Sequence, residues 1–405
     1  MAERLECRFV DWEAEGATLR SDWDALQQRT ASGSDPLLSH VWYDAWRSVF
    51  GGRIRSRVIT VRRDGILTGI LPVVIGRVLR SPSMMVRHDY MPGDDRFVTA
   101  RQRSRIIPVR QLSPVLGLEA ATWRGGPLLD PKHEGASLEA LLGFLQNCAG
   151  WDLAVFPLAA SASERMAETC RSMGIAARID RLDRPMYHRE DLPPWEMFLK
   201  SKNSHFRKRY QETARRAARE GLTFQTFSGQ DGIEAALAKV AEVAERSWKA
   251  GGREGQAVLV PYTPESRRFF ETLCTASDAI VPVVSVVAQG DAAKAVLLSA
   301  AYGRRLVTLL TFYEPSLRHI SLGRILIKMA HEWAVEHGLS EIDFNSNNAF
   351  AAIYADQHDV YHNLTLFSGS LYGRLLRAVS KAWKGAEEQS AATGGQTDPW
   401  PEATP

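Results

Sequence analysis

Residues 309–339 read LLTFYEPSLRHISLGRILIKMAHEWAVEHGL. The pattern predicts a buried strand at 306–313, a loop from Arg318 to Arg324, and an amphipathic helix after it. A helix start presents unpaired N–H groups and the positive end of the helix dipole, so it suits a phosphate. Gly323 leaves room for a ligand to approach the backbone, and two guanidinium groups match phosphate oxygens. The stretch is either a phosphate-binding loop or an ordinary strand–turn–helix connection.

The composition is that of a folded protein of about two domains. The chain has 405 residues, of which 45% are hydrophobic and 24% are charged, and chains of this length usually form more than one domain. The formal net charge of +3 is small for this size. It argues against a dedicated nucleic-acid binder but is compatible with a local basic patch, so no DNA partner is expected.

Cysteine spacing and hydropathy suggest a cytoplasmic protein without metal. The four cysteines are scattered and form no CxxC or Cys/His cluster, so neither a zinc site nor a disulfide framework is expected. The N-terminus is charged and lacks the apolar segment of a signal peptide. The longest apolar stretches, 65–75 and 279–288, are too short to cross a bilayer and are expected to form strands.

The two halves of the chain show the same order of elements. In the first half, helices at 21–28 and 36–50 precede a hairpin of strands 56–62 and 66–75. The second half is expected to hold a basic helix at 195–220, helices at 233–249 and 264–275, strands at 281–288, 293–302 and 306–313, a helix at 322–337, and strands at 341–345 and 361–367. The shared order predicts two α/β modules, 1–190 and 191–384, and a disordered tail at 385–405.

This ordered set of motifs resembles the tandem-GNAT (FemAB-related) acetyltransferases, and among them the CelD/BcsL type of cellulose and exopolysaccharide synthesis. The motifs are the pair Trp42 and Trp46, the segments Glu245–Lys249, Tyr313–Pro315 and Ile342–Phe344, the late Tyr354, and the loop Arg318-x-x-Ser321-x-Gly323. Ser321 replaces the first glycine of the family's pyrophosphate loop. The resemblance implies an α/β (α+β) fold of two tandem GNAT-like modules. Each is a mixed, mostly antiparallel sheet flanked by helices, with a cleft between them.

The resemblance also implies acetyl-CoA as the acyl donor, bound by the second module. The first half has no comparable loop, so the acceptor is expected in the cleft between the halves. The expected donor-binding residues are Leu310, Thr311, Phe312, Arg318, Ser321, Leu322, Gly323 and Arg324.

Acyl transfer from a thioester needs a base for the nucleophile and a proton donor for the thiolate. Glu314, Asp343 and His319 are candidate bases, and partial burial would raise the pKa of Asp343 and suit that role. Tyr354 falls where the family often carries a tyrosine that protonates the thiolate. The other interpretations are a solvated turn residue for Glu314, a strand-end hydrogen-bond acceptor for Asp343, and a core ring for Tyr354.

Candidate acceptor-binding residues are Arg207, Trp248, Asn345 and Asn347. Amides bind sugar hydroxyls well, but a cluster of asparagines also favours turns. The basic helix that contains Arg207 is either a solvated face, a site for an anionic acceptor, or a site for transfer RNA. Transfer RNA is disfavoured, because the helix lacks an antiparallel partner and sustained heptads.

The sequence therefore predicts an acyl-CoA-dependent N- or O-acyltransferase of bacterial cell-envelope or exopolysaccharide (cellulose-type) synthesis. Its acceptor would be a small or lipid-linked saccharide or amino sugar. One alternative is an aminoacyl-tRNA-dependent, FemAB-like transferase on a peptidoglycan precursor. Another is a non-catalytic GNAT-like scaffold in a polysaccharide synthase complex. Ala355 stands where the family usually has lysine, and the residues at 345–348 replace its glycines, so the acceptor site departs from the family pattern.

Overall fold

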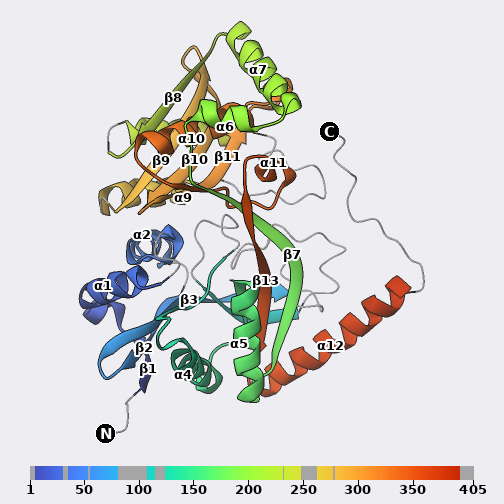
Figure 1. Ribbon diagram of the computed structural model, residues 1–405. Coiled ribbons are helices and arrows are strands. Elements are labelled where there is room, and N and C mark those ends of the chain that lie inside the picture. Colours follow the sequence, from blue (N-terminus) through green and yellow to red (C-terminus); the bar gives the residue numbers. More distant parts are fainter. Residues whose placement is uncertain are drawn as a thin grey trace.

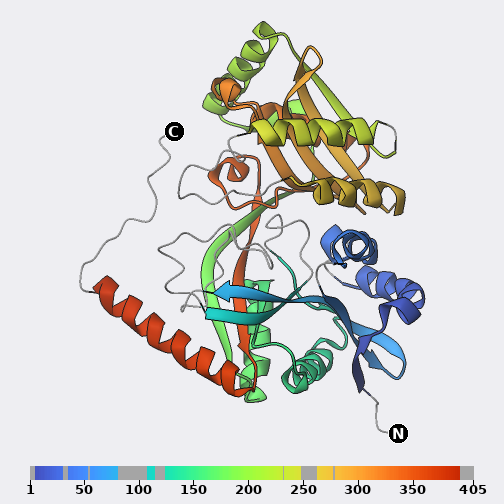
Figure 2. The same cartoon turned by 180° about the vertical axis from the view of Figure 1, so that it is seen from behind.

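The computed structural model describes residues 5–30, 35–52, 55–80, 107–114, 124–230, 232–247, 262–276 and 279–392. In this part of the chain, 13 strands form one continuous sheet that runs through both halves of the molecule, with helices packed on it (Figures 1 and 2). The fold is thus a mixed α/β architecture with a large, mostly antiparallel sheet, as predicted. No helix among these residues is long and apolar enough to cross a membrane.

The first half contains the following elements: β1 (Leu5–Val10), α1 (Trp12–Gln28), the 3-10 helix η1 (Pro36–Leu38), α2 (His40–Phe50), β2 (Ser56–Arg63), β3 (Ile66–Arg80), β4 (Ile107–Pro114), β5 (Leu128–Leu129), α4 (Glu134–Asn147), β6 (Leu153–Ala159), α5 (Ala160–Ser172) and β7 (Ala177–Glu190).

The second half contains α6 (Trp195–Ser201), α7 (Ser204–Arg219), β8 (Leu222–Ser228), α8 (Ile233–Arg246), α9 (Pro264–Ala276), β9 (Ile280–Gln289), β10 (Ala292–Tyr302), β11 (Arg305–Tyr313), the 3-10 helix η3 (Pro315–Ile320), α10 (Gly323–Glu336), β12 (Glu341–Asp343), α11 (Ala349–Ala352), β13 (Gln357–Phe367) and α12 (Leu371–Ala392).

The last strand of the chain returns to the first half. The strand order is β1-β2-β3-β4-β6-β13-β7-β12-β11-β10-β9-β8, with β5 beside β3. Strand β13 lies between β6 and β7 and is antiparallel to both, and the end of β7 pairs with β12. Two long strands therefore cross the junction (Figure 1). The division at residue 190 remains a prediction, and 357–367 are built into the sheet of the first half.

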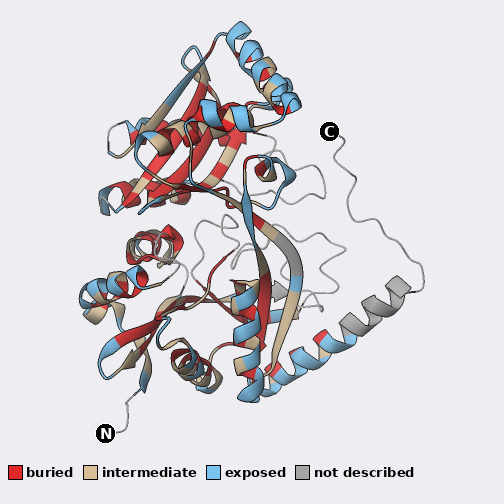
Figure 3. Ribbon diagram, in the orientation of Figure 1, coloured by how far each residue is buried: buried red, intermediate tan, exposed pale blue. Residues whose placement is uncertain are grey.

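The two halves also share a hydrophobic core. The ring of Trp42, on α2, meets that of Phe269, on α9, edge-on at 4.8 Å between centroids. Both residues belong to one buried cluster that contains side chains from α1, α2, α8, α9 and β10. In Figure 3, α2 and the strands of the second half are coloured largely as buried. Because apolar burial is the main driving force of folding, we expect the halves to unfold together.

Several predicted elements are confirmed and others need correction. The hairpin β2–β3 forms as predicted. The helix predicted at 36–50 begins at His40, where the Ser39 side chain accepts the Trp42 N–H, and residues 36–38 form η1 instead. The basic helix predicted at 195–220 is broken, because the side chain of Asn203 accepts the Phe206 N–H at 2.8 Å and starts a new helix there. No strand was predicted at 107–114, where β4 forms. Helix α12 includes residues 385–392, which were expected to be disordered; residues 393–405 lie outside the described residues.

Candidate active site

Strands β11 and β12 diverge and open a wedge in the sheet. They run parallel over three residue pairs, the last of which is Val307 with Asp343. Beyond this point β11 continues against β10, and a register shift leaves Leu309 as an extra residue. The chain after β12 instead turns away, with Asn345 at a φ of 42°. The predicted donor residues 310–312 lie on β11 beyond the point of divergence.

Helix α10 begins at the open end of this wedge, after η3. Ser321 joins η3 to α10 with a φ of 63°, in the left-handed region where glycine has the least strain. This explains why a glycine is usual at the position that Ser321 occupies. Within the described part of the chain, the structure gives no hydrogen-bond acceptor for the amides of Leu322 and Gly323. The helix start therefore presents two N–H donors, as a phosphate site requires.

The surroundings of the helix start are cationic and closely packed. Arg318 is exposed, and Arg324 lies with its guanidinium carbon 5.8 Å from the ring centre of Phe206. Arg216, from α7, donates to the carbonyl of His319 at 2.7 Å and adds a third guanidinium. A Cβ placed on Gly323 would lie 3.2 Å from the Phe350 ring. A side chain larger than that of glycine would therefore have little room at this position, and the phosphate-binding role of the loop remains a prediction.

Tyr354 lies beside this helix start, in an aromatic cluster. Its ring is 1% exposed and packs against Phe198, Phe206 and Phe350, with centroids at 6.2, 5.6 and 5.2 Å. Its hydroxyl has no hydrogen-bond partner among the described residues. Burial raises the pKa of Tyr354, so the hydroxyl stays protonated at neutral pH and keeps a proton that it can donate.

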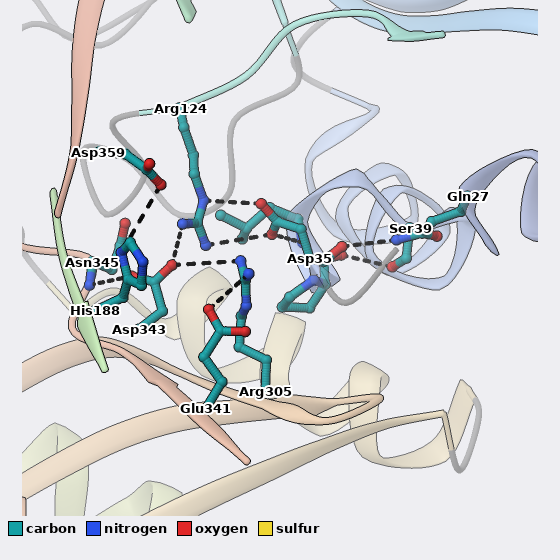
Figure 4. A network of polar contacts seen from close by, with 12 residues as sticks. Gln27, Asp35, Ser39, Arg124, His188, Arg305, Glu341, Asp343, Asn345 and Asp359 are labelled. Carbon is teal, nitrogen blue, oxygen red and sulfur yellow. Dashed lines mark hydrogen bonds and ion pairs between the residues drawn. The ribbon is translucent and has the colours of Figure 1, made fainter. Parts of the chain in front are cut away.

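A network of buried charges joins the two halves on the other side of the wedge (Figure 4). Arg124, from the first half, bridges Asp35 at 2.9 Å and Asp343 on β12. Arg305, on β11, pairs with Glu341 at 2.7 Å and approaches Asp343 at 3.8 Å. Arg124 and the three carboxylate side chains are less than a tenth exposed. Acidic and basic side chains alternate along the network, so the attraction between neighbours offsets part of the cost of removing each charge from water.

The raised pKa expected for Asp343 is wrong. Burial alone would raise its pKa, but the charges of Arg124 and Arg305 and the hydrogen bond from the Asn345 amide, at 2.7 Å, outweigh it, so the pKa is lowered. A carboxylate held in its ionised form is a weak base. Asp343 is therefore suited to holding Arg124 and the Asn345 backbone in position, and not to accepting a proton.

Sequence reasoning missed His188, which lies beside Asp343. His188, on β7, is the cross-strand partner of Asp343, and cross-strand partners point to the same face of a sheet. Its side chain is 12% exposed, and its Nδ1 lies 3.9 Å from the Asp359 carboxylate. Figure 4 shows the imidazole with Asp343, Asn345 and Asp359. The position of His188 opposite the buried Asp343 marks it as a candidate site residue, but this position is known only once the pairing of β7 with β12 is known.

The three predicted catalytic residues do not converge. Glu314 pairs with Lys294 at 2.7 Å and follows β11 seven positions after Val307, which is about 20 Å along a strand. Asp343 belongs to the face turned toward the first half, whereas Tyr354 belongs to the cluster packed on α10. The structure thus places Glu314 at the open end of the wedge, far from Asp343.

The predicted acceptor residues are also dispersed. Asn345 is buried at the wedge, and Asn347 is exposed in the loop that follows. Arg207 donates to the carbonyls of Lys200 and Lys202, so it holds the turn between α6 and α7. Trp248 lies outside the described residues. Among the residues described, no group of three or more His, Cys, Asp or Glu could hold a metal ion.

Comparisons with known proteins agree with this geometry. Residues 204–354 match the model of the acetyltransferase (GNAT) domain family. The solved structure of FemX has a TM-score of 0.55 at 12% identity, over 93% of this chain and 100% of that one. The C-terminal domain of a protein assigned as a lysylphosphatidylglycerol synthetase from Agrobacterium fabrum has a TM-score of 0.50 at 13% identity, over 92% and 96%.

A tandem GNAT protein of the clavulanic acid pathway has a TM-score of 0.49 at 12% identity, over 91% of this chain and 99% of that one. No curated protein matches the sequence. At these identities the structural likeness concerns the fold, and the family match concerns the second half, where the wedge and the start of α10 lie. Residues 204–354 are a GNAT-type acetyltransferase domain, and the chain is an acyltransferase.

Proposed function

We propose that this protein transfers an acyl group from acyl-CoA to an amine or hydroxyl of a saccharide or amino-sugar intermediate of envelope polysaccharide synthesis. The observation that carries the donor half of this proposal is the pair of available amides at Leu322 and Gly323, at the open end of the wedge. The acceptor half rests on the polar face of the sheet that turns toward the first half of the chain.

The donor would lie along β11, with its phosphates at the start of α10. Arg318 and Arg324 supply cations there, and Gly323 supplies space. Coenzyme A, when bound, would supply the acyl group as a thioester. The protonated hydroxyl of Tyr354, which lies in the same cluster as Phe350, is the group we assign to proton donation on this side.

The acceptor would approach from the face that carries the charge network. His188 is the group we assign as the base, because an imidazole can accept a proton from an amine or hydroxyl near neutral pH. Asp343 would hold the Asn345 backbone and Arg124 in place, and the Asn345 side chain would contact the acceptor.

A second candidate function is aminoacyl-tRNA-dependent transfer, and the surface of α7 favours it. Lys208, Arg209, Arg215 and Arg219 are exposed on this helix, and an array of cations suits a nucleic-acid backbone.

The experiment is calorimetric titration of the protein with acetyl-CoA, comparing wild type with Gly323→Glu. The matched control is Gly135→Glu, which also adds a carboxylate near the start of a helix, α4, where a Cβ meets nothing within 4 Å. We expect micromolar binding by wild type and by the control, and none by Gly323→Glu. Failure of the folded wild type to bind acetyl-CoA would overturn the acyl-CoA proposal, and dependence of activity on charged tRNA would support the second candidate.

A further inference from the structure

Helix α12 leaves the fold at the end of β13 that is far from the wedge. Strand β13 starts beside His188, at the junction of the halves, and ends at Phe367, and α12 begins four residues later. One side of the helix packs on the first half through Leu376, which is 1% exposed, and through Ser380, which accepts a hydrogen bond from Arg178. Figures 1 and 2 show the helix starting near the base of the molecule, beside α5, and projecting outward from the first half.

The outer side of α12 carries an apolar stripe. Leu371 is 85% exposed and Leu375 is 56% exposed. They are four residues apart, so they lie on the same face of the helix, and the exposed Ala378 and Ala382 continue this face. Leu371 is the most exposed of the large hydrophobic side chains in the described part of the chain. A stripe of this kind is typical of an unoccupied contact surface.

Cations border the apolar stripe. Arg374, Arg377 and Lys381 are exposed, and residues 371–386 contain no aspartate or glutamate. Two nearby carboxylates already have basic partners, since Asp180 on β7 pairs with Arg178 at 2.8 Å and Asp152, just before β6, pairs with Arg110 at 2.7 Å. The outer face of α12 is therefore both apolar and positively charged.

We propose that α12 docks the protein on the surface of an anionic lipid bilayer. Leucines that enter the interface and cations that meet lipid phosphates are the features of helices that lie in the plane of a membrane. A second copy of the chain fits less well. Antiparallel pairing of this face would bring Arg374, Arg377 and Lys381 of one copy against the same residues of the other, and like charges in an interface are unfavourable. The proposal does not depend on the acyl donor or acceptor.

The experiment is co-sedimentation of the full chain with phosphatidylcholine vesicles that contain or lack phosphatidylglycerol. We expect binding to the anionic vesicles that weakens as ionic strength rises. The double variant Leu371→Asp/Leu375→Asp should lower the partition coefficient about tenfold or more. The matched control is Ile66→Asp in the β2–β3 hairpin, because Ile66 is 64% exposed and lies on another surface; it should bind like wild type. Arg377→Gln/Lys381→Gln should remove most of the preference for phosphatidylglycerol.

Circular dichroism and acetyl-CoA titration of each variant establish that loss of binding is not loss of folding, since α12 lies away from the wedge. Equal binding to both kinds of vesicle, or equal binding by wild type and the leucine double variant, would overturn the proposal. A dimer of the wild type that the leucine substitutions dissociate, seen by light scattering without vesicles, would also overturn it, because the stripe would then be a protein contact.

Discussion

The guanidinium of Arg124 donates to the carboxylate of Asp343, although the two residues are 219 positions apart and belong to different halves of the chain. Arg124 also holds Asp35 at 2.9 Å, and all three side chains are less than a tenth exposed. These ion pairs connect β12, which forms one side of the wedge, to the first half of the chain. We infer that the first half packs against the second half and also holds β12 in position through Arg124.

Replacement of Arg124 by methionine should destabilise the protein strongly. It would leave two buried carboxylates without their shared cation, and breaking a buried ion pair from one side costs about 3–5 kcal/mol. The free energy of unfolding from urea titration measures the effect. Arg171→Met is the control, because the Arg171–Glu168 pair is 72% and 68% exposed and such pairs contribute about 0–1 kcal/mol. Equal losses in the two variants would contradict a central role for Arg124.

The triple variant Arg124→Met/Asp35→Asn/Asp343→Asn should recover part of this stability, since no uncompensated charge is left. It should not recover full transferase activity, because the neutral amide oxygen introduced at position 343 accepts the Asn345 N–H more weakly than the carboxylate does. Recovery of both would mean that the network serves only stability.

Removal of the Tyr354 hydroxyl should lower activity without lowering the stability of the fold. The hydroxyl is buried without a partner among the described residues, and loss of such a group is neutral or stabilising by about 1 kcal/mol. If it donates a proton, Tyr354→Phe should lower kcat by about 10²-fold or more while the Kd for acetyl-CoA stays unchanged. Steady-state kinetics and thermal melting give the two readouts. Unchanged kcat would make Tyr354 a core ring only.

Much of the fold could be predicted from sequence, because it depends on local pattern. The strand–loop–helix around Gly323 follows from apolar periodicity, and the wedge-side strand β11 lies within one residue of the range predicted. The insertion of β13 between β6 and β7 could not be predicted, since pairing between distant strands leaves no local signal. For the same reason the partners of Asp343 were missed. Burial without partners would raise a carboxylate pKa, and only the fold brings Arg124 to it.

His188 should be needed for turnover and not for donor binding. His188→Gln keeps a polar side chain of similar reach but cannot take up a proton, so kcat/KM should fall about 10²–10⁴-fold. Acetyl-CoA titration should match that of wild type, because the donor loop lies at the other end of the wedge. His358→Gln on β13 is the matched control, since His358 is exposed and packs on the Tyr187 ring at 5.9 Å. Equal activity of the two variants would remove His188 from the mechanism.

Stability should fall as the pH is lowered below about 6.5, the ordinary pKa of histidine. Burial lowers the pKa of His331, and its Nε2 lies 2.6 Å from the Pro193 carbonyl. A histidine whose pKa is lower in the folded protein binds fewer protons there than in the unfolded chain. The free energy of unfolding is therefore highest above the unfolded pKa and declines as the pH falls toward the folded pKa. The lowered pKa of Asp343 acts in the same direction but in a separate window, below about pH 4.

Urea unfolding at a series of pH values tests this. The slope between about pH 6.5 and 5 should decrease in His331→Asn, which cannot be protonated in this range, and the acid loss below about pH 4 should remain. His40 is also buried and its pKa is also lowered, so part of the pH dependence between about pH 6.5 and 5 should remain in this variant. A pH dependence in His331→Asn identical to that of wild type would show that this histidine does not set the acid sensitivity of the fold.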